Sequence, residues 1–214
     1  MPTPEALDDR ALVKAAQKGD ADAFRQLVER YQRRVYQLAV GMVKDLDEAM
    51  DIAQETFVRV HRYLPSFKGD SSFFTWTYRI ATNLSLDAVR RRGRGERVPL
   101  RPGDAEEAEI EAAMDPPSAA LAGPQRAALN EELKQKLEEA LESLSGNHRA
   151  ILLLREVEGL SYEELSKALG IRKGTVMSRL FHARLKMQKK LREYLGEDAP
   201  RQKDTGGDDD DESL

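Results

Sequence analysis

The chain has 214 residues, of which 40% are hydrophobic and 34% are charged, and it contains no cysteine. This length suits one ordinary domain or two small ones, and the lack of cysteine excludes disulfides, thiol catalysis, thiolate zinc sites and a thiol redox sensor within the chain. No apolar run approaches the roughly eighteen residues that span a bilayer, and no signal-peptide core is present, so we expect a cytoplasmic protein without membrane insertion.

The charge is distributed unevenly along the chain. The formal net charge is −4, but residues 197–214 hold eight acidic and two basic side chains, and residues 99–118 hold six acidic and one basic. The rest of the chain therefore carries +7, and it contains the segments with folding patterns. That basic remainder favours a nucleic-acid partner, whereas we expect residues 197–214 to be a disordered acidic tail.

Apolar residues recur at helical spacing through the first 92 residues. The pattern predicts a helix over residues 21–43, a second helix over 46–64 that Pro65 ends, and a third from Phe73 to Leu84. No alternating strand pattern interrupts them. We therefore expect an all-α fold in which residues 1–92 form a helical bundle.

A stretch rich in proline, glycine and acidic residues follows at residues 93–123 and lacks periodicity. Such a composition buries too little apolar surface to offset the entropy of ordering, so we expect a flexible acidic linker. Helical spacing resumes over residues 124–196, where Ser161 and Glu164 fit a capping box and Gly170 fits a tight turn. We expect two small helical domains, of which the second is a helix-turn-helix domain.

The predicted helix-turn-helix carries the first functional signal. Between Arg172 and Arg192 there are eight basic residues and no acidic one. The start of its second helix, residues 172–179, is placed to enter a major groove, where Arg and Lys donate to guanine and Ser or Thr to bases or phosphates. A solvated basic helix within a bundle is the alternative, but the cap, the turn and the charge asymmetry together favour a DNA reader.

Aromatic residues are concentrated at the end of the first bundle. Six of the thirteen lie close together: Tyr63, Phe67, Phe73, Phe74, Trp76 and Tyr78. Arg79, Asn83 and a basic run at residues 90–94 follow them. Aromatic rings beside cations can stack unpaired bases and hold a single-stranded backbone, and an amide can read a base edge. A bundle core with an exposed aromatic rim is the alternative; a second DNA reader downstream favours single-strand binding.

A third feature is a row of carboxylates: Asp45, Asp47, Glu48, Asp51 and Glu55. The three histidines are scattered, and the motifs of zinc proteases, P-loops and nucleophile elbows are absent from the sequence. We therefore expect no metal, no cofactor and no catalytic residue. The row is interpreted either as a solvated face or as a docking face for a basic partner.

Four motifs resemble a known family: residues 47–58, 67–83, 152–166 and 174–184. The first two are similar to region 2, and the last two to region 4, of the extracytoplasmic-function (ECF) subfamily of bacterial sigma-70 factors. The motifs occur in the family's order, and the segments between them have the family's lengths. The resemblance covers nearly all of the chain that is predicted to be ordered.

The resemblance implies a transcription initiation factor and not an enzyme. Such a factor binds core RNA polymerase at the clamp helices of the largest subunit and at the flap. Its region 4 recognises duplex promoter DNA at the −35 element, while its region 2 opens the −10 element and captures single-stranded DNA. On the same ground we expect a role in transcription regulation and stress response, and an anti-sigma factor as a further partner.

The resemblance, together with the patterns above, assigns residues to three contact sets. The −35 set is Arg172, Lys173, Thr175, Ser178, Arg179, His182 and Arg184. The −10 set is Phe67, Lys68, Ser72, Phe74, Trp76, Tyr78, Arg79, Asn83, Arg90 and Arg91. The polymerase set is Asp51, Gln54, Glu55 and Phe57.

The chain departs from the family pattern at Arg172, where many relatives have a small residue, and at Met177, where they have a cation. Its −35 preference therefore cannot be copied from a relative. The Asp-rich tail is either solubilising or folds back on the recognition helix. Two other functions remain open: a homodimeric helix-turn-helix regulator that binds duplex DNA, and an enzyme that acts on nucleotides through the carboxylate row.

Overall fold

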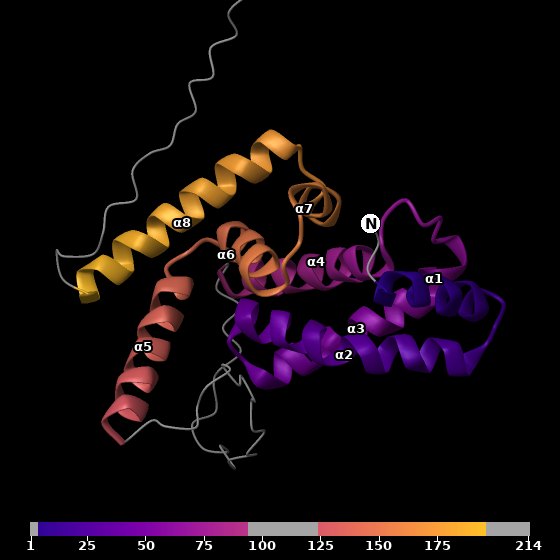
Figure 1. The fold of residues 1–214 in the computed structure, drawn as a ribbon, viewed down its shortest axis with the longest axis horizontal. Coiled ribbons are helices and arrows are strands. Elements are labelled where there is room, and N and C mark those ends of the chain that lie inside the picture. Colours follow the sequence, from indigo (N-terminus) through magenta and orange to yellow (C-terminus); the bar gives the residue numbers. More distant parts are fainter. Residues whose placement is uncertain (1–3, 94–123, 196–214) are drawn as a thin grey trace, which may run out of the picture.

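The computed structural model describes residues 4–93 and 124–195, and every regular element within these ranges is a helix (Figure 1). This confirms the all-α fold class. The N-terminal unit consists of α1 (Pro4–Gln17), α2 (Ala21–Val43), α3 (Leu46–Tyr63), the 3₁₀ turn η1 (Leu64–Ser66) and α4 (Phe73–Gly93). The C-terminal unit consists of α5 (Pro124–Glu142), α6 (Gly146–Leu152), the π-helical turn η2 (Leu153–Val157), α7 (Tyr162–Leu169) and α8 (Lys173–Leu195). Apart from Gly93, the expected linker lies outside the described residues, as does the expected acidic tail.

Local sequence signals set the limits of α2 and α3. The Asp20 carboxylate accepts a hydrogen bond from the backbone N–H of Ala23 at 3.0 Å and so caps the start of α2. Lys44 takes the left-handed conformation that ends α2, with φ 60°. Asp45 then caps α3 by accepting from the N–H of Glu48 at 2.9 Å. The predicted helix over residues 21–43 is therefore confirmed in its position.

Helix α1 (Pro4–Gln17) was not predicted. A buried carboxylate attaches it to the bundle: Asp9 accepts hydrogen bonds from Arg30 at 2.6 Å and from the hydroxyl of Tyr31. Burial, assisted by the hydrogen bond to Asp9, raises the pKa of Tyr31 far above its ordinary value. Tyr31 therefore stays a neutral hydrogen-bond donor to Asp9.

The helix-turn-helix forms as the sequence predicts. The Ser161 hydroxyl accepts from the N–H of Glu164 at 3.3 Å, and the Glu164 carboxylate accepts from the N–H of Ser161 at 2.9 Å, which completes the capping box. Gly170 ends α7 in the left-handed conformation with φ 64°. α8 then buries Val176 and Leu180 in the core of this unit.

The helical segment before the capping box has two parts. α6 ends at Leu152 and continues as the π-helical turn η2, in which the N–H of Glu158 donates to the carbonyl of Leu153 at 3.1 Å. A π turn holds one residue more than an α turn, so the side chains that follow it are redirected.

The two units pack directly against each other, an arrangement that the sequence did not predict. α4 lies between α2 and α3 on one side and α6 and α7 on the other (Figure 1). The buried side chains of both units belong to one continuous apolar core.

Candidate nucleic-acid interface

The −35 set lies on α8 or directly before it. Arg172, Lys173, Ser178, His182 and Arg184 are exposed, whereas Thr175 and Arg179 are half-buried. The rest of the helix-turn-helix fixes their positions, because the opposite face of α8 is buried through Val176, Leu180 and Ala183. The fold therefore presents one polar, cationic face of the second helix of a helix-turn-helix to the outside.

Two cations of this face are paired with carboxylates of their own unit. Lys173 Nζ lies 2.9 Å from Glu163 Oε1, and this contact holds the pKa of Glu163 below its ordinary value. Arg184 Nη2 lies 2.7 Å from Glu156 Oε1. All four side chains are largely exposed, so these pairs contribute little to stability, and the cations can exchange a carboxylate for a phosphate.

An apolar stripe on α8 was missed in the sequence. Met177, Phe181 and Leu185 are 54%, 54% and 50% exposed, and they recur every four residues beside the basic positions. The ring of Phe181 touches that of His182, with centroids 5.4 Å apart. Apolar side chains in a major groove can contact the methyl group of thymine. The spacing of four residues was the signal in the sequence that could have identified this stripe.

His148 lies beside the cationic face of α8. It stands in the first turn of α6, and its imidazole Nδ1 lies 3.0 Å from the hydroxyl of Ser145. Its pKa is lowered from the ordinary value, first by partial burial and then by the positive charges of Lys186, His182 and Arg179. The start of α6 therefore borders the cationic face of α8.

A stacked aromatic pair lies at the start of α4. The rings of Phe67 and Trp76 are 4.6 Å apart with an interplanar angle of 25°, and both side chains are half-buried. Phe73 packs beneath them and is only 3% exposed. Ser72 caps the helix, since its hydroxyl accepts from the N–H of Thr75 at 3.0 Å. The pair is thus a supported aromatic surface, as base stacking requires.

A polar row continues from this pair along α4. Trp76, Arg79, Asn83 and Arg90 are separated by three, four and seven residues, which places them on one face of the helix. Arg79, Asn83 and Arg90 are exposed, as are the neighbouring Arg91 and the loop residue Lys68. At 1.5 Å per residue the row is about 21 Å long.

Two members of the −10 set point elsewhere. Tyr78 is fully buried and donates a hydrogen bond to Glu158 at 2.6 Å, and burial together with that carboxylate raises its pKa far above the ordinary value. Phe74 is half-buried, with the guanidinium of Arg34 4.4 Å from its ring centroid. Neither ring lies on the exposed row, because the C-terminal unit packs against this side of α4.

The carboxylate row on α3 divides into structural and outward-facing members. Asp45 caps the helix, and Asp45 and Glu48 lie 3.3 and 2.6 Å from Arg92 Nη2. Phe57 of the polymerase set is 9% exposed and packs in the core, where it supports α3. Asp47 and Asp51 are exposed.

An apolar stripe accompanies the outward-facing carboxylates. Leu46, Met50 and Val58 are 62%, 43% and 50% exposed, and Gln54 fills the missing position of this four-residue repeat. Glu55 is paired with Arg59 at 2.7 Å. The outer face of α3 is therefore both apolar and acidic, a combination typical of docking surfaces. The motif assigned Phe57 to the polymerase set, and Leu46, Met50 and Val58 were not assigned to it.

Residues 4–93 and 124–195 show neither a candidate metal site nor a candidate membrane span. These ranges contain no group of three or more metal-ligating side chains that could hold an ion. None of their helices is long and apolar enough to cross a membrane.

Comparison with known families supports the division into two units. Residues 27–95 match the family described as Sigma-70 region 2, and residues 134–187 match the family described as Sigma-70, region 4. The chain is 40% identical over 193 residues to the RNA polymerase sigma-H factor of Pseudomonas aeruginosa, covering 88% of this chain and 96% of the relative. It is 40% identical over 194 residues to the ECF RNA polymerase sigma-E factor of Escherichia coli K12, covering 89% and 98%.

Solved structures show the same fold. CnrH in complex with the cytosolic domain of CnrY matches with a TM-score of 0.62 at 26% identity, over 86% of this chain and 97% of that one. The sigma factor RpoE of Bartonella quintana, in complex with the anti-sigma factor NepR, matches with a TM-score of 0.57 at 25% identity, over 79% and 96%.

Proposed function

We propose that this chain, which belongs to the extracytoplasmic-function group of sigma-70 factors, engages polymerase and promoter through three separate surfaces. As a sigma factor with regions 2 and 4, it serves promoter-specific transcription initiation with RNA polymerase, and its family consists of initiation factors and not enzymes. It acts in the cytoplasm, where bacterial polymerase works.

The cationic face of α8 binds the duplex −35 element. Arg172 and Lys173 lead the recognition helix into the major groove, while Phe181 contacts a thymine methyl group. Each phosphate that a Lys or Arg neutralises contributes about −0.9 to the log–log slope of affinity against salt. The remaining members of the −35 set position the helix on the backbone.

The stacked pair Phe67 and Trp76 captures an unpaired base of the −10 element, and Asn83 reads an edge of the single strand. Arg79, Arg90 and Arg91 of α4 hold its backbone, together with Lys68 of the loop before that helix. Stacking of a base on an aromatic side chain contributes about 1–3 kcal/mol, whereas unstacking the duplex costs a few kcal/mol per base step. The chain alone therefore melts DNA poorly, and contacts with polymerase supply the difference.

The outer face of α3 docks on core polymerase at the clamp helices. Asp51, Gln54 and Glu55 provide the polar contacts, and Leu46, Met50 and Val58 provide the apolar area. Phe57 does not touch polymerase; it packs in the core and holds α3 in position. Region 4 contacts the flap, as in the family.

A regulatory partner is part of the proposal. Two solved structures that match the chain are complexes, one with the cytosolic domain of CnrY and the other with the anti-sigma factor NepR. We propose that this chain, which shares their fold, is likewise held by an anti-sigma factor.

The exposed row from Trp76 to Arg90 is the observation that carries the proposal, and Asn83→Ala tests it. We expect about a tenfold loss of open complex, detected by permanganate reactivity, with unchanged binding of a −35 duplex, because one amide–base contact contributes about 1–3 kcal/mol. Gln37→Ala, which removes an exposed amide from α2, is the matched control. Equal losses in both assays would contradict the assignment.

A further inference from the structure

The recognition helix carries a stripe of cations that its own unit does not neutralise. The members of this stripe are separated by three, four and three residues and therefore share one face of α8: Arg179, His182, Lys186 and Lys189. Lys173 and Arg184 have carboxylate partners, whereas no described residue forms an ion pair with Arg179, Lys186 or Lys189. This α8 cation stripe can therefore bind an anion from outside the described residues.

The helix that borders the α8 cation stripe supplies no carboxylate. α6 packs against α8, and none of its residues, Gly146–Leu152, is acidic. His148 of α6 faces the stripe. Its pKa is lowered first by partial burial and then by the positive charges of Lys186, His182 and Arg179. Every charge that shifts this pKa is positive, so the described residues give the stripe no counter-charge on this side, and a bound polyanion would relieve the repulsion.

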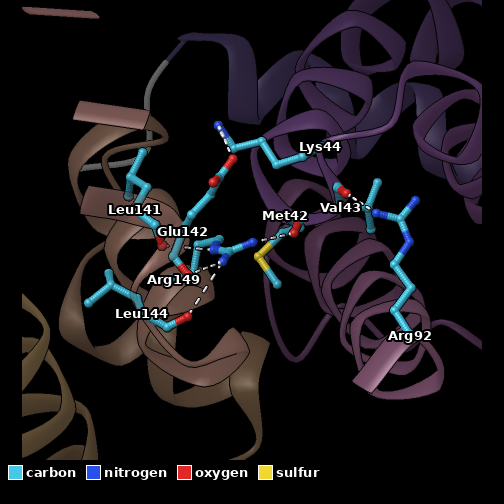
Figure 2. Close-up of polar contacts among 8 residues, drawn as sticks. All are labelled: Met42, Val43, Lys44, Arg92, Leu141, Glu142, Leu144 and Arg149. Carbon is cyan, nitrogen blue, oxygen red and sulfur yellow. Dashed lines mark hydrogen bonds and ion pairs between the residues drawn. The ribbon is translucent and has the colours of Figure 1, made fainter. Parts of the chain in front are cut away.

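Arg149, the residue after His148, fixes α6 in this position. Figure 2 shows its buried guanidinium between the C-terminal ends of two helices. Its Nε and Nη2 donate to the carbonyls of Leu141 and Glu142 in α5 at 3.0 and 2.9 Å, and its Nη1 donates to the carbonyl of Met42 in α2 at 2.7 Å. A cation at helix C-termini satisfies orphan carbonyls and is favoured by the helix dipoles. The border of the stripe is therefore preformed, and a bound anion need not order it.

The sequence supplies a polyanion shortly after α8. Five consecutive residues are acidic, Asp208–Asp211 and Glu212. The intervening residues 196–207 hold three acidic and two basic side chains, so the negative charge of this part of the chain is concentrated at 208–212. None of the three contact sets includes this acidic segment, which lies outside the described residues. Its charge is complementary to that of the α8 cation stripe.

The length of chain between the two charged segments matches the position of the stripe. Asp208 is thirteen residues beyond Leu195, the last residue of α8. A coil of that length spans about 20 Å on average. At 1.5 Å per residue along the helix, Lys189 is about 9 Å and Arg179 about 24 Å from Leu195, whereas Arg172 is about 35 Å away. The acidic segment therefore reaches the stripe more readily than it reaches the start of the recognition helix.

We propose that the acidic segment 208–212 binds the α8 cation stripe of its own chain and there competes with the phosphates of DNA. The stripe shares Arg179 and His182 with the −35 set, so duplex DNA and the segment exclude each other. This consequence for DNA rests on the proposed function, but the contact itself does not. A tether of this length gives an effective concentration on the order of millimolar, so a few weak surface ion pairs are enough to occupy the stripe.

Paramagnetic broadening of amide resonances in the full chain tests the contact, without DNA or polymerase. The chain has no cysteine, so Ser213→Cys places a single nitroxide label directly after the acidic segment. The comparison protein is a neutral-tail variant of the same length, in which the four residues Asp208–Asp211 are replaced by Asn. At about 50 mM salt we expect stronger broadening of residues 179–189 in the parent than in this variant, and at about 300 mM no difference, because salt screens exposed ion pairs.

Three outcomes of this experiment would overturn the proposal. Equal broadening in the parent and in the neutral-tail variant would mean that only the tether brings the label near α8. Broadening centred on the basic residues of α4 would place the segment on the other DNA-binding surface. Broadening that passes from a spin-labelled chain to an isotope-labelled second chain in a mixture would mean that the segment binds another copy.

Competition with DNA is measured by fluorescence anisotropy of a labelled 20-base-pair duplex of arbitrary sequence. Apparent affinity is reduced by the fraction of stripes that the segment occupies, so at about 50 mM salt the neutral-tail variant should bind about fivefold more tightly than the parent. The two affinities should converge as salt rises to about 300 mM. The matched control neutralises four exposed carboxylates of α2 and α5, as Asn or Gln, and should gain less than about twofold: Asp22, Glu29, Glu132 and Glu138. An equal gain in the control would mean that net charge alone sets the affinity.

A second background separates a defined contact from general repulsion. Lys186→Gln combined with Lys189→Gln removes two cations of the stripe that are not members of the −35 set. In this background the neutral-tail substitutions should no longer change the affinity for the duplex. A gain of about fivefold that persists there would overturn the proposal. Failure of the chain to support transcription with core polymerase would instead refute the proposed function, whatever the amide resonances show.

Discussion

Arg149→Lys tests whether one side chain joins α2, α5 and α6. The guanidinium donates three hydrogen bonds of 2.7 to 3.0 Å to carbonyls on two helices. A lysine ammonium is a single point of charge and cannot span these carbonyls, so it keeps one bond and loses two. Hydrogen bonds from a charged group contribute about 1.5–3 kcal/mol each. We expect the loss of two bonds to lower the free energy of unfolding by about 3 kcal/mol, the lower limit for two bonds, because water can enter the site.

The assay is thermal unfolding followed by circular dichroism. For a protein of this size 1 kcal/mol corresponds to about 2–4 °C, so Tm should fall by about 6–12 °C. Arg155→Lys is the matched control, because Arg155 donates one backbone hydrogen bond within the C-terminal unit, to Leu160 at 2.7 Å. A fall of less than about 2 °C for Arg149→Lys, or equal falls for both variants, would refute the reasoning.

Three further predictions concern the C-terminal unit. Ser161→Ala removes the capping box and should cost about 1 kcal/mol of unfolding free energy in denaturant titration; no change would mean that the cap is dispensable. Phe181→Ala should leave Tm nearly unchanged, because the ring is 54% exposed, and should weaken −35 duplex binding by about tenfold in fluorescence anisotropy. The pKa of His148 is lowered in the folded state by burial and by neighbouring cations. Protonation of His148 therefore destabilises the fold, and the free energy of unfolding should fall as pH decreases below the unfolded pKa of about 6.5. His148→Gln should remove that part of the pH dependence in urea titrations, and an unaltered profile would contradict the assignment.

Local signals predicted the helices well, because capping and left-handed turns depend on neighbouring residues. Asp20, Ser161 and Gly170 each act within four residues of their own position, and each does what its type predicts. Helix α1 was not predicted, although Val13 is buried in the core and Leu12 and Ala16 pack against it, in addition to the ion pair from Asp9 to Arg30.

Contacts between the units could not be predicted from the sequence. Glu158 lies 124 residues from Arg34, and Arg149 lies 107 residues from Met42, so no local pattern connects them. The same packing explains why Tyr78, expected to face DNA, is buried.

The sequence predicted least well which side chains of a helix point outward at the candidate site. Phe57 was placed in the polymerase set because of a motif, although helical spacing from the core residue Val60 puts it on the buried side of α3. Met50 and Phe181 were passed over, yet each belongs to a four-residue apolar repeat among charged residues. The four-residue spacing of apolar residues among charged ones was the signal that could have identified them.

Run-off transcription with core RNA polymerase lacking a sigma factor tests the central claim most directly. We predict that the chain co-elutes with the core enzyme and that a promoter-dependent transcript appears only when both are present. A chain that neither co-elutes with core polymerase nor yields a transcript from any of a library of promoter sequences would contradict the account.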